Sequence, residues 1–366
     1  MRGDSAPELR QILDEDGQLR DDAVVPDLTD DELLELFRML KLARHYDERA
    51  IKLQRQGRMG TYSPIAGQEA GHAASAFALS GDDWILPSHR ADIASRIRGL
   101  GLEFHLMYCM GMERGNRIPE DTPVFPVTLP IATQIPHAVG MAWASKYMGS
   151  DRVFMPYFGD GGTSEGDFHE GLNFAGVFDT PTVFFINNNQ WAISIGPDQQ
   201  TKSRTLAQKA DAYGFEGVRV DGMDPLAVYQ VTHEAIEKAR DPPEGELRPT
   251  LIEALTYRFG PHTTSDDPSV YREDEELERW EQRDPIPRME TFLRDTGRLD
   301  AELLETIEQQ VADEVNEAID IAESVDRPEP TNMFDHTFAE PTPRLQAQRE
   351  ELQMLREEYG DDAFTH

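Results

Sequence analysis

The sequence predicts an α/β protein with a mostly parallel sheet and helices on both faces. Short apolar runs alternate with helical segments between residues 152 and 255, and strands separated by helices usually pair in parallel. A glycine-rich turn follows the first of these runs, as expected where a parallel strand passes into its crossover helix. The 366 residues are enough to bury a large core without disulfides.

The N-terminal part is predicted to consist of an arm followed by helices. Residues 1–28 carry acidic clusters with little periodicity, so we expect an acidic, loosely held N-terminal arm. A long helix is predicted to begin after Thr29, which can form a capping box with Glu32, and to end near Gly57. Further helices are predicted at about residues 67–79, 91–98, 102–110 and 134–147.

The middle third supplies the strands of the predicted sheet. Strands are expected at 152–158, 182–186, 218–220 and 251–255, with a helix at 225–239. Together with the helices before them they are expected to form one α/β domain over residues 29–275, which ends in a polar loop from residue 260. Residues 276–366 are expected to add a C-terminal extension packed on the same domain. Its first part, to residue 325, has a helical and charged pattern, and the last forty residues are rich in proline and are expected to be irregular.

The charge of the chain excludes whole classes of partner. Lys and Arg number 35 against 69 Asp and Glu, which gives a net charge of -34 that repels nucleic acid and anionic membranes. No apolar stretch approaches the roughly 18 to 20 residues that cross a bilayer. Six of the cationic residues are lysine, and this Arg-rich, carboxylate-rich balance is typical of a folded halophilic protein. An acidic disordered chain is disfavoured by the 8% aromatic content.

The single cysteine, Cys109, cannot form an internal disulfide. The N-terminal residues are polar and acidic, unlike a signal peptide. We therefore expect a cytoplasmic protein.

The most informative segment is the turn at residues 159–166, with the sequence GDGGTSEG. Glycines let backbone N–H groups approach an anion, and a helix start adds unpaired N–H groups, so the turn can hold phosphate. Ser164 and Asp167 are expected to cap the following helix. A Rossmann dinucleotide site is disfavoured, because Ser164 stands where glycine or alanine is required.

A run of three asparagines, residues 187–189, follows the second strand. Parallel strands joined by a right-handed crossover end at the same edge of a sheet, so Asp160 and Asn189 should converge there. Their oxygens, a backbone carbonyl and a diphosphate would suit Mg²⁺. Taken separately, an Asp in a glycine turn and an Asn run are usually a tight turn and a strand end.

In combination, these features resemble the thiamine diphosphate fingerprint. The chain resembles the alpha subunit of the two-subunit decarboxylase component of 2-oxo acid dehydrogenase complexes, of the pyruvate and branched-chain types. The likeness extends from about residue 30 to 360. Its motifs lie at residues 54–58, 67–70, 87–90, 132–136, 159–166, 188–194 and 260–267.

The resemblance implies a set of site residues within a thiamine diphosphate-binding fold. Magnesium would be held by Asp160, Asn189 and the main-chain carbonyl of Trp191. Ile131 stands where the family props the cofactor into its bent form. The remaining cofactor contacts are implied at His89, Arg90, Leu129, Gly161, Gly162 and His262. Some relatives also hold a structural K⁺ near the positions of Thr128, Pro130, Thr133 and Gln134.

Two positions depart from the family pattern. Branched-chain relatives often have an arginine to the diphosphate at the position of Asn187, so neutralisation here must rely on the metal and Arg90. The loop serine that is phosphorylated in animal relatives is Thr263 here, which puts regulation by phosphorylation in doubt.

The implied reaction is oxidative decarboxylation of a 2-oxo acid with acyl transfer to lipoamide. We hypothesise that His262 is the catalytic residue that assists proton movement during this transfer. The family's activating glutamate comes from a separate beta subunit. An alpha2-beta2 assembly and docking on a lipoyl-bearing acyltransferase are therefore implied.

Several alternatives remain open from the sequence. Pyruvate is favoured as the substrate because residues 60–65 resemble bacterial pyruvate forms, whereas residues 132–136 are closer to branched-chain forms. An acetoin-cleaving enzyme has the same motifs. A non-catalytic acidic binding protein is the remote alternative and would not bind thiamine diphosphate.

Overall fold

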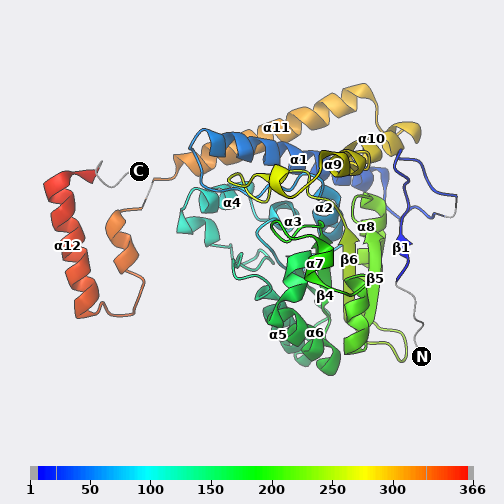
Figure 1. Cartoon of the computed structure of the whole chain (residues 1–366), viewed down its shortest axis with the longest axis horizontal. Helices are drawn as coiled ribbons and strands as arrows, with labels where there is room; N and C mark the ends of the chain where they lie inside the picture. The colour runs from blue at the N-terminus through cyan, green and yellow to red at the C-terminus, as the bar shows by residue number, and fades with distance from the viewer. Residues whose placement is uncertain (1–6, 22, 327, 362–366) are drawn as a thin grey trace. The chain divides into compact units, whose positions relative to one another are not determined.

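The computed structural model describes residues 7–21, 23–326 and 328–361. The chain divides into two compact units, residues 1–322 and residues 323–366. The first unit contains the sheet and most of the helices, and Figure 1 shows their order along the chain. No helix in the described ranges is long and apolar enough to span a membrane. The cytoplasmic location stays a prediction.

The sheet has six strands, all parallel, in the order β1-β5-β6-β4-β3-β2. The predicted α/β class with a mostly parallel sheet is therefore confirmed. The four predicted strands are present, whereas the sequence analysis missed two short ones at the sheet edges, β1 and β2. The strands are β1 (Leu9–Arg10), β2 (Trp84–Leu86), β3 (Phe154–Gly159), β4 (Val183–Asn188), β5 (Glu216–Asp221) and β6 (Thr250–Leu255).

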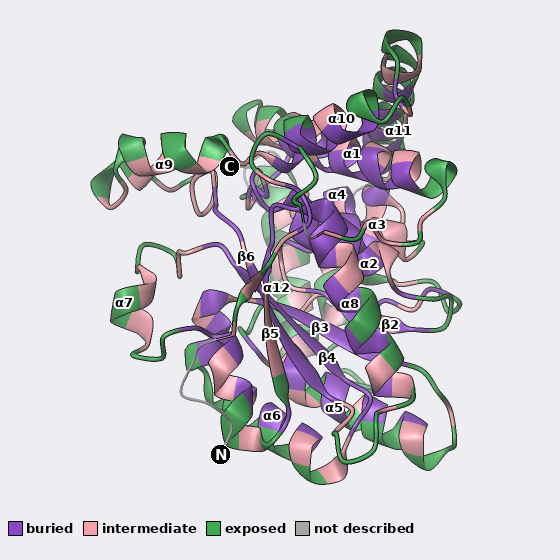
Figure 2. Ribbon diagram, turned by 90° about the vertical axis from the view of Figure 1, so that its right-hand side faces the viewer, coloured by how far each residue is buried: buried purple, intermediate pink, exposed green. Residues whose placement is uncertain are grey.

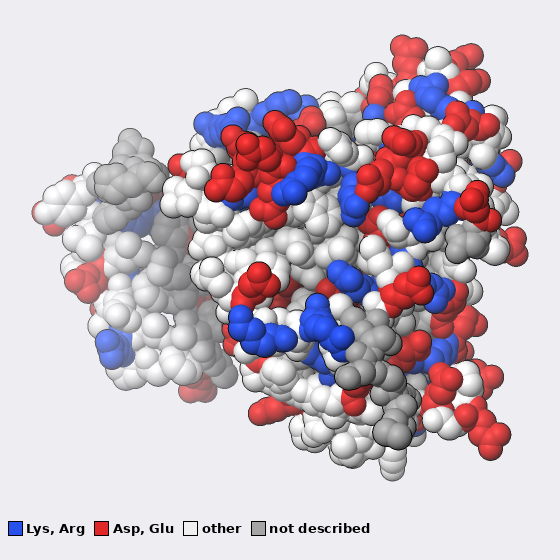
Figure 3. Space-filling view, turned by 45° about the vertical axis from the view of Figure 1, so that its right-hand side comes forward, with Lys and Arg blue, Asp and Glu red and all other residues white. Residues whose placement is uncertain are grey.

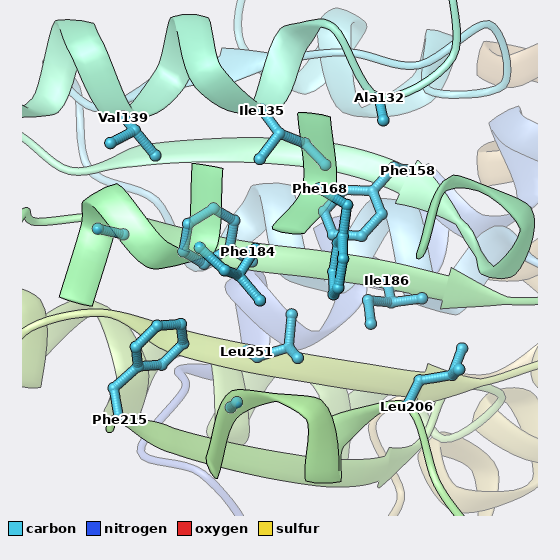
Figure 4. Close-up of a cluster of buried hydrophobic side chains, with 13 residues drawn as sticks. Ala132, Ile135, Val139, Phe158, Phe168, Phe184, Ile186, Leu206, Phe215 and Leu251 are labelled. Atoms are coloured by element: carbon cyan, nitrogen blue, oxygen red, sulfur yellow. The ribbon is translucent and has the colours of Figure 1, made fainter. Parts of the chain in front are cut away.

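Helices cover both faces of the sheet, as predicted (Figure 2). On one face, α5 (Gln134–Tyr147) and α6 (Gly166–Phe178) pack on β3 and β4 around Phe184 and Ile186 (Figure 4). Successive side chains of a strand point to opposite faces, so Asn187 faces α2 (Glu69–Phe77) on the other side. The alternation along β4 thus directs polar groups at its carboxyl end toward α2.

The remaining helices of the first unit follow the predicted pattern closely. The capping box of Thr29 and Glu32 is confirmed. The helix it begins ends at Arg55, two residues before Gly57, which has a positive φ of 72°. These helices are α1 (Asp30–Arg55), α3 (Asp92–Ile97), α4 (Leu102–Cys109), α7 (Pro197–Gln200), α8 (Pro225–Arg240), α9 (Asp274–Glu281), α10 (Pro285–Asp295) and α11 (Ala301–Ser324). Short 3-10 helices occur at η1 (Glu113–Asn116), η2 (Asp160–Ser164), η3 (Ala207–Tyr213) and η4 (Pro268–Val270).

The N-terminal segment is more ordered than expected. Leu9–Arg10 pair with β5, and the backbone N–H groups of Ile12 and Leu13 both donate to Asp224 Oδ2 at 2.7 Å. The buried Arg288 donates to Asp221 at 3.0 Å and to the main-chain carbonyl of Leu13. These contacts show that the expectation of a loosely held arm was wrong for residues 9–13. No sequence pattern indicated them, because a strand of two residues is too short to produce a periodic pattern.

The second unit contains η5 (Pro330–Phe334) and the 17-residue helix α12 (Pro343–Tyr359). Prolines had suggested irregular structure here, but Pro343 occupies the first turn of α12, where its missing N–H costs nothing. The domain boundaries after residues 28 and 275 stay predictions.

Acidic side chains are spread over the face shown in Figure 3, among fewer basic ones. Salt adaptation of this surface stays a prediction.

Candidate active site

The candidate site lies where β3 and β4 end. These strands are adjacent and parallel, with Gly159 opposite Asn187, so Asp160 and Asn189 follow neighbouring strand ends at one edge of the sheet. Both line a cavity of about 230 Å³. The cavity is lined by Gln68, His72, Ser88, His89, Arg90, Ile131, Gly159, Asp160, Gly161, Gly162, Glu165, Asn187, Asn189, Trp191, Ala192, Ile193 and His262.

The cavity contains all but one of the site residues that the sequence indicated. The exception is Leu129, which is 62% exposed and is not among the lining residues. Its cofactor contact, and the roles of the others, stay predictions. The sequence analysis gave no site role to two further lining residues, Gln68, which directly precedes α2, and His72 on α2.

The glycine turn forms the 3-10 helix η2, and α6 begins only at Gly166. A Cβ on Gly161 would lie 2.9 Å from the Cβ of Ala192, so this position has no room for a side chain. The expected cap by Ser164 and Asp167 is wrong, because Glu165 precedes α6 and its side chain makes no capping hydrogen bond. The tight winding of η2 moves the helix start beyond Ser164.

Asp160 is a buried carboxylate that accepts a hydrogen bond from the side chain of Gln200. The amide Nε2 of Gln200 donates to Asp160 Oδ2 at 2.6 Å. Asp160 is 2% exposed, and burial raises its pKa, although the hydrogen bond from Gln200 acts in the opposite direction. A divalent cation would stabilise the ionised form of this carboxylate.

Asn189 has its side-chain amide fixed at both ends. Its Nδ2 donates to Gln68 Oε1 at 2.8 Å, and its Oδ1 accepts from the backbone N–H of Trp191 at 3.1 Å. Asn187 also donates to Gln68 Oε1, at 2.9 Å. No group of three or more His, Cys, Asp or Glu suited to a metal ion occurs among the described residues. A metal in this cavity would therefore be held mainly by neutral oxygens and Asp160, which suits Mg²⁺.

Arg90 is a buried cation without an acidic partner among the described residues. Its guanidinium donates to the carbonyls of Pro64, at 2.5 Å, and His262, at 2.6 Å. Burial, assisted by the nearby Arg258, lowers the pKa of Arg90 to about 10. A buried charge needs compensation, so this side of the cavity is suited to an anion.

Two histidines beside Arg90 are neutral at physiological pH. Burial lowers the pKa of His89 to about 3, and burial together with Arg90 lowers that of His262 to about 4. Arg90 Nη2 lies 3.0 Å from His262 Nδ1. A guanidinium can only donate, so Nδ1 accepts and the neutral ring of His262 carries its proton on Nε2.

Comparison with known proteins identifies the family. Residues 37–331 match the model of the family described as dehydrogenase E1 component. The chain belongs to the dehydrogenase E1 component family. It is 42% identical over 345 residues to the Staphylococcus epidermidis protein named pyruvate dehydrogenase E1 component subunit alpha, covering 94% of this chain and 92% of that relative. The Bacillus subtilis protein of the same name is 42% identical over 342 residues, covering 93% and 91%.

Membership of the E1 family implies thiamine diphosphate as the cofactor, and the cavity fits its diphosphate group. Gly161 allows the close backbone approach that an anion requires. Arg90 supplies a buried cation that forms no ion pair with an acidic residue in the described ranges, and Asp160 supplies a buried carboxylate of the kind that a divalent metal would bind. The donor set therefore agrees with the chemistry of the group.

Arg258, which the sequence analysis did not single out, lies behind the loop that lines the cavity at residues 191–193. Its buried guanidinium donates to the carbonyl of Ile193 at 2.8 Å and lies 3.5 Å from that of Trp191. Gln190 and Ile193 have positive φ values of 70° and 57°, an unusual backbone for these residue types. Arg258 thus holds the loop that presents the Trp191 carbonyl.

The suggested K⁺ region forms a compact turn. Thr133 Oγ1 lies 2.8 Å from the Pro130 carbonyl and 3.5 Å from Thr128 Oγ1, and Gln134 Oε1 is buried without a partner among the described residues. These oxygens are of the type that K⁺ binds, but the ion stays a prediction.

Proposed function

We propose that this chain is the alpha subunit of a pyruvate dehydrogenase that decarboxylates pyruvate and transfers the acetyl group to lipoamide. The observation that carries the proposal is the convergence of Asp160, Asn189 and the buried Arg90 on one cavity at the sheet edge. The relatives named pyruvate dehydrogenase, at 42% identity over more than nine-tenths of the chain, support pyruvate as the substrate.

The side chains divide into a metal end and a phosphate end. Asp160, Asn189 and the Trp191 carbonyl would hold Mg²⁺, with Arg258 keeping the Trp191 loop in place. His89, Arg90 and the backbone of Gly161 and Gly162 would hold the diphosphate. When bound, thiamine diphosphate supplies the carbanion and the electron sink for decarboxylation.

His262 would contribute a hydrogen-bond donor on a neutral ring rather than a positive charge. Its ring is neutral near pH 7, and its Nε2–H is free to donate because Nδ1 accepts from Arg90. The backbone N–H of His262 donates to Asp266 Oδ2 at 2.7 Å, which fixes the loop. From this position the ring can hydrogen-bond to the reacting acyl group. To pass a proton as that group moves to the lipoyl arm, His262 must take one up at Nδ1 in exchange for the one that leaves Nε2, which requires Arg90 to release Nδ1.

The remaining proposals concern the partners. A beta subunit in an alpha2-beta2 assembly would supply the activating glutamate and cover the apolar side chains at the cavity edge, Ile131 and Ile193, which are 47% and 59% exposed. Ile131 would also support the bent cofactor. The lipoyl-bearing acyltransferase would then take up the acyl group.

The test is co-expression with a beta-type partner, followed by assays with an artificial electron acceptor. Pyruvate should give the highest kcat/KM. Preference for a branched-chain 2-oxo acid or for acetoin would reassign the substrate but keep the cofactor site. No turnover with any of the three, together with no thiamine diphosphate binding, would favour a non-catalytic binding protein.

A further inference from the structure

Gln68 is a buried residue whose side-chain oxygen is hydrogen-bonded, whereas its side-chain nitrogen has no partner among the described residues. It is 0% exposed and directly precedes α2, yet its side chain makes no capping hydrogen bond. Its Oε1 accepts from the Nδ2 groups of both Asn187 and Asn189. Its Nε2 has no hydrogen-bond partner in the described part of the chain, and Gln68 lines the cofactor cavity.

The orientation of this amide is determined by its neighbours. Turning Gln68 by 180° about its last torsion would place Nε2 against the donor Nδ2 groups of Asn187 and Asn189. Turning Asn189 instead would break the bond from the Trp191 backbone N–H to its Oδ1. Asn187 adds no independent constraint, because the Thr256 hydroxyl, 3.3 Å from Asn187 Oδ1, can donate or accept. Oε1 must therefore face the asparagines, which leaves both N–H donors of Gln68 Nε2 without a partner among the residues that the structure describes.

A buried, unpaired donor at a binding cavity is costly unless a ligand completes it. Arg90 lines the same cavity and is a buried cation, which also favours an anion there. Asn187, which the alternation along β4 places beside Gln68, brings no charge. An oxygen of the diphosphate is therefore the ligand that best matches both Gln68 and Arg90.

On the basis of the proposed function, we propose that Gln68 is a binding and positioning residue for the metal–diphosphate group. Its Nε2 donates to a diphosphate oxygen. Its Oε1 holds the amide of Asn189 in the orientation that offers Oδ1 to the metal. One side chain thus contacts the diphosphate through Nε2 and orients a metal ligand through Oε1.

The two roles are separable by two substitutions. Gln68→Glu keeps an oxygen for Asn187 and Asn189 but replaces the donor by a repelling carboxylate. Gln68→Leu removes both the donor and the acceptor. We expect both variants to weaken diphosphate binding. Gln68→Leu should also raise the Mg²⁺ concentration needed for half-saturation, whereas Gln68→Glu should leave that concentration unchanged.

The experiment is calorimetric titration of the co-expressed alpha–beta enzyme. Thiamine diphosphate and inorganic diphosphate are used as probes, each over a range of Mg²⁺ concentrations. Losing a hydrogen bond to a charged group should raise Kd by roughly 10- to 100-fold, for both probes. Gln310→Glu, an exposed position on α11, adds the same charge far from the cavity and should bind like the wild type. Circular dichroism checks that each variant is folded.

The outcomes separate this inference from the proposed function. Unchanged Kd values in folded Gln68→Glu and Gln68→Leu would overturn the role of Gln68, while wild-type binding would leave the proposed function intact. A loss for thiamine diphosphate but not for inorganic diphosphate would also overturn it, because the contact would lie elsewhere on the cofactor. Absence of binding by the wild type would overturn both. If Gln68→Leu does not fold, the Gln68→Glu titration alone decides the donor role.

Discussion

Arg90 contacts His262 at two points through a single nitrogen. Its Nη2 donates to the main-chain carbonyl of His262 at 2.6 Å and lies 3.0 Å from ring Nδ1. The other terminal nitrogen, Nη1, donates to the carbonyl of Pro64. The phosphate end of the cavity is therefore organised around a planar group that joins two loops, residues 60–65 and 260–267.

Replacing Arg90 by lysine should weaken the cofactor site. A single ammonium cannot reproduce the forked contacts to Pro64 and His262 while also binding phosphate. We expect the Kd for thiamine diphosphate to rise by about 10- to 100-fold, measured by calorimetry. Arg98→Lys is the matched control, since Arg98 also donates to several backbone carbonyls but lies outside the cavity lining. It should reduce thermal stability without changing Kd, and an equal loss of affinity in both variants would refute the assignment.

Removing the ring of His262 should block acyl transfer. His262→Ala lacks the Nε2 proton and is expected to abolish acylation of a lipoyl substrate, measured by mass spectrometry of the lipoyl protein. His262→Asn can still accept from Arg90 but has no imidazole, so it should retain more cofactor affinity and remain defective in transfer. Near-normal acylation by either variant would show that the histidine is only structural.

The buried His72 should make the stability of the protein depend on pH. Burial lowers its pKa to about 4 from the usual 6.5, so between these values the unfolded state binds more protons. Stability is complete above pH 6.5 and falls as the pH decreases toward 4, by about 2 kcal/mol at pH 5 for this group. Urea unfolding of wild type and His72→Gln at pH 7 and pH 5 measures the effect. The difference between the two pH values should be about 2 kcal/mol smaller in the variant, and an unchanged difference would argue against a neutral buried His72.

Salt should stabilise the protein strongly. With a net charge of -34, the compact state suffers self-repulsion, which salt screens as the Debye length falls from about 10 Å at 0.1 M to about 3 Å at 1 M. The urea midpoint should rise steadily between 0.1 M and 2 M KCl. A midpoint independent of KCl would contradict the interpretation of the acidic composition as salt adaptation.

The sequence predicted the part of the site that depends on regular geometry. Asp160 and Asn189 could be placed together because each follows a recognisable strand and parallel neighbours end at one edge. Arg90 and His262 came from the family resemblance, since loop residues carry no periodicity that would bring them together.

Other features could not be predicted because their cause is tertiary. Gln68, at the start of α2, and Asn187, on β4, are hydrogen-bonded although they lie 119 residues apart in the sequence. Gln68 lies in the motif at residues 67–70 that contributes to the family resemblance, but that motif does not say which side chains it meets. Strands β1 and β2, of two and three residues, form through pairing with longer neighbours rather than through their own sequence.

The most direct test of the account is calorimetric titration of thiamine diphosphate into the alpha–beta enzyme with Mg²⁺, with EDTA, and in the Asp160→Asn variant. The wild type should bind only with Mg²⁺. The variant should lose affinity by more than about 100-fold without losing stability, because the substitution removes a carboxylate whose ionised form burial disfavours and keeps an oxygen for Gln200. Equal binding with and without Mg²⁺, or by Asp160→Asn, would contradict a metal–diphosphate site at the ends of β3 and β4.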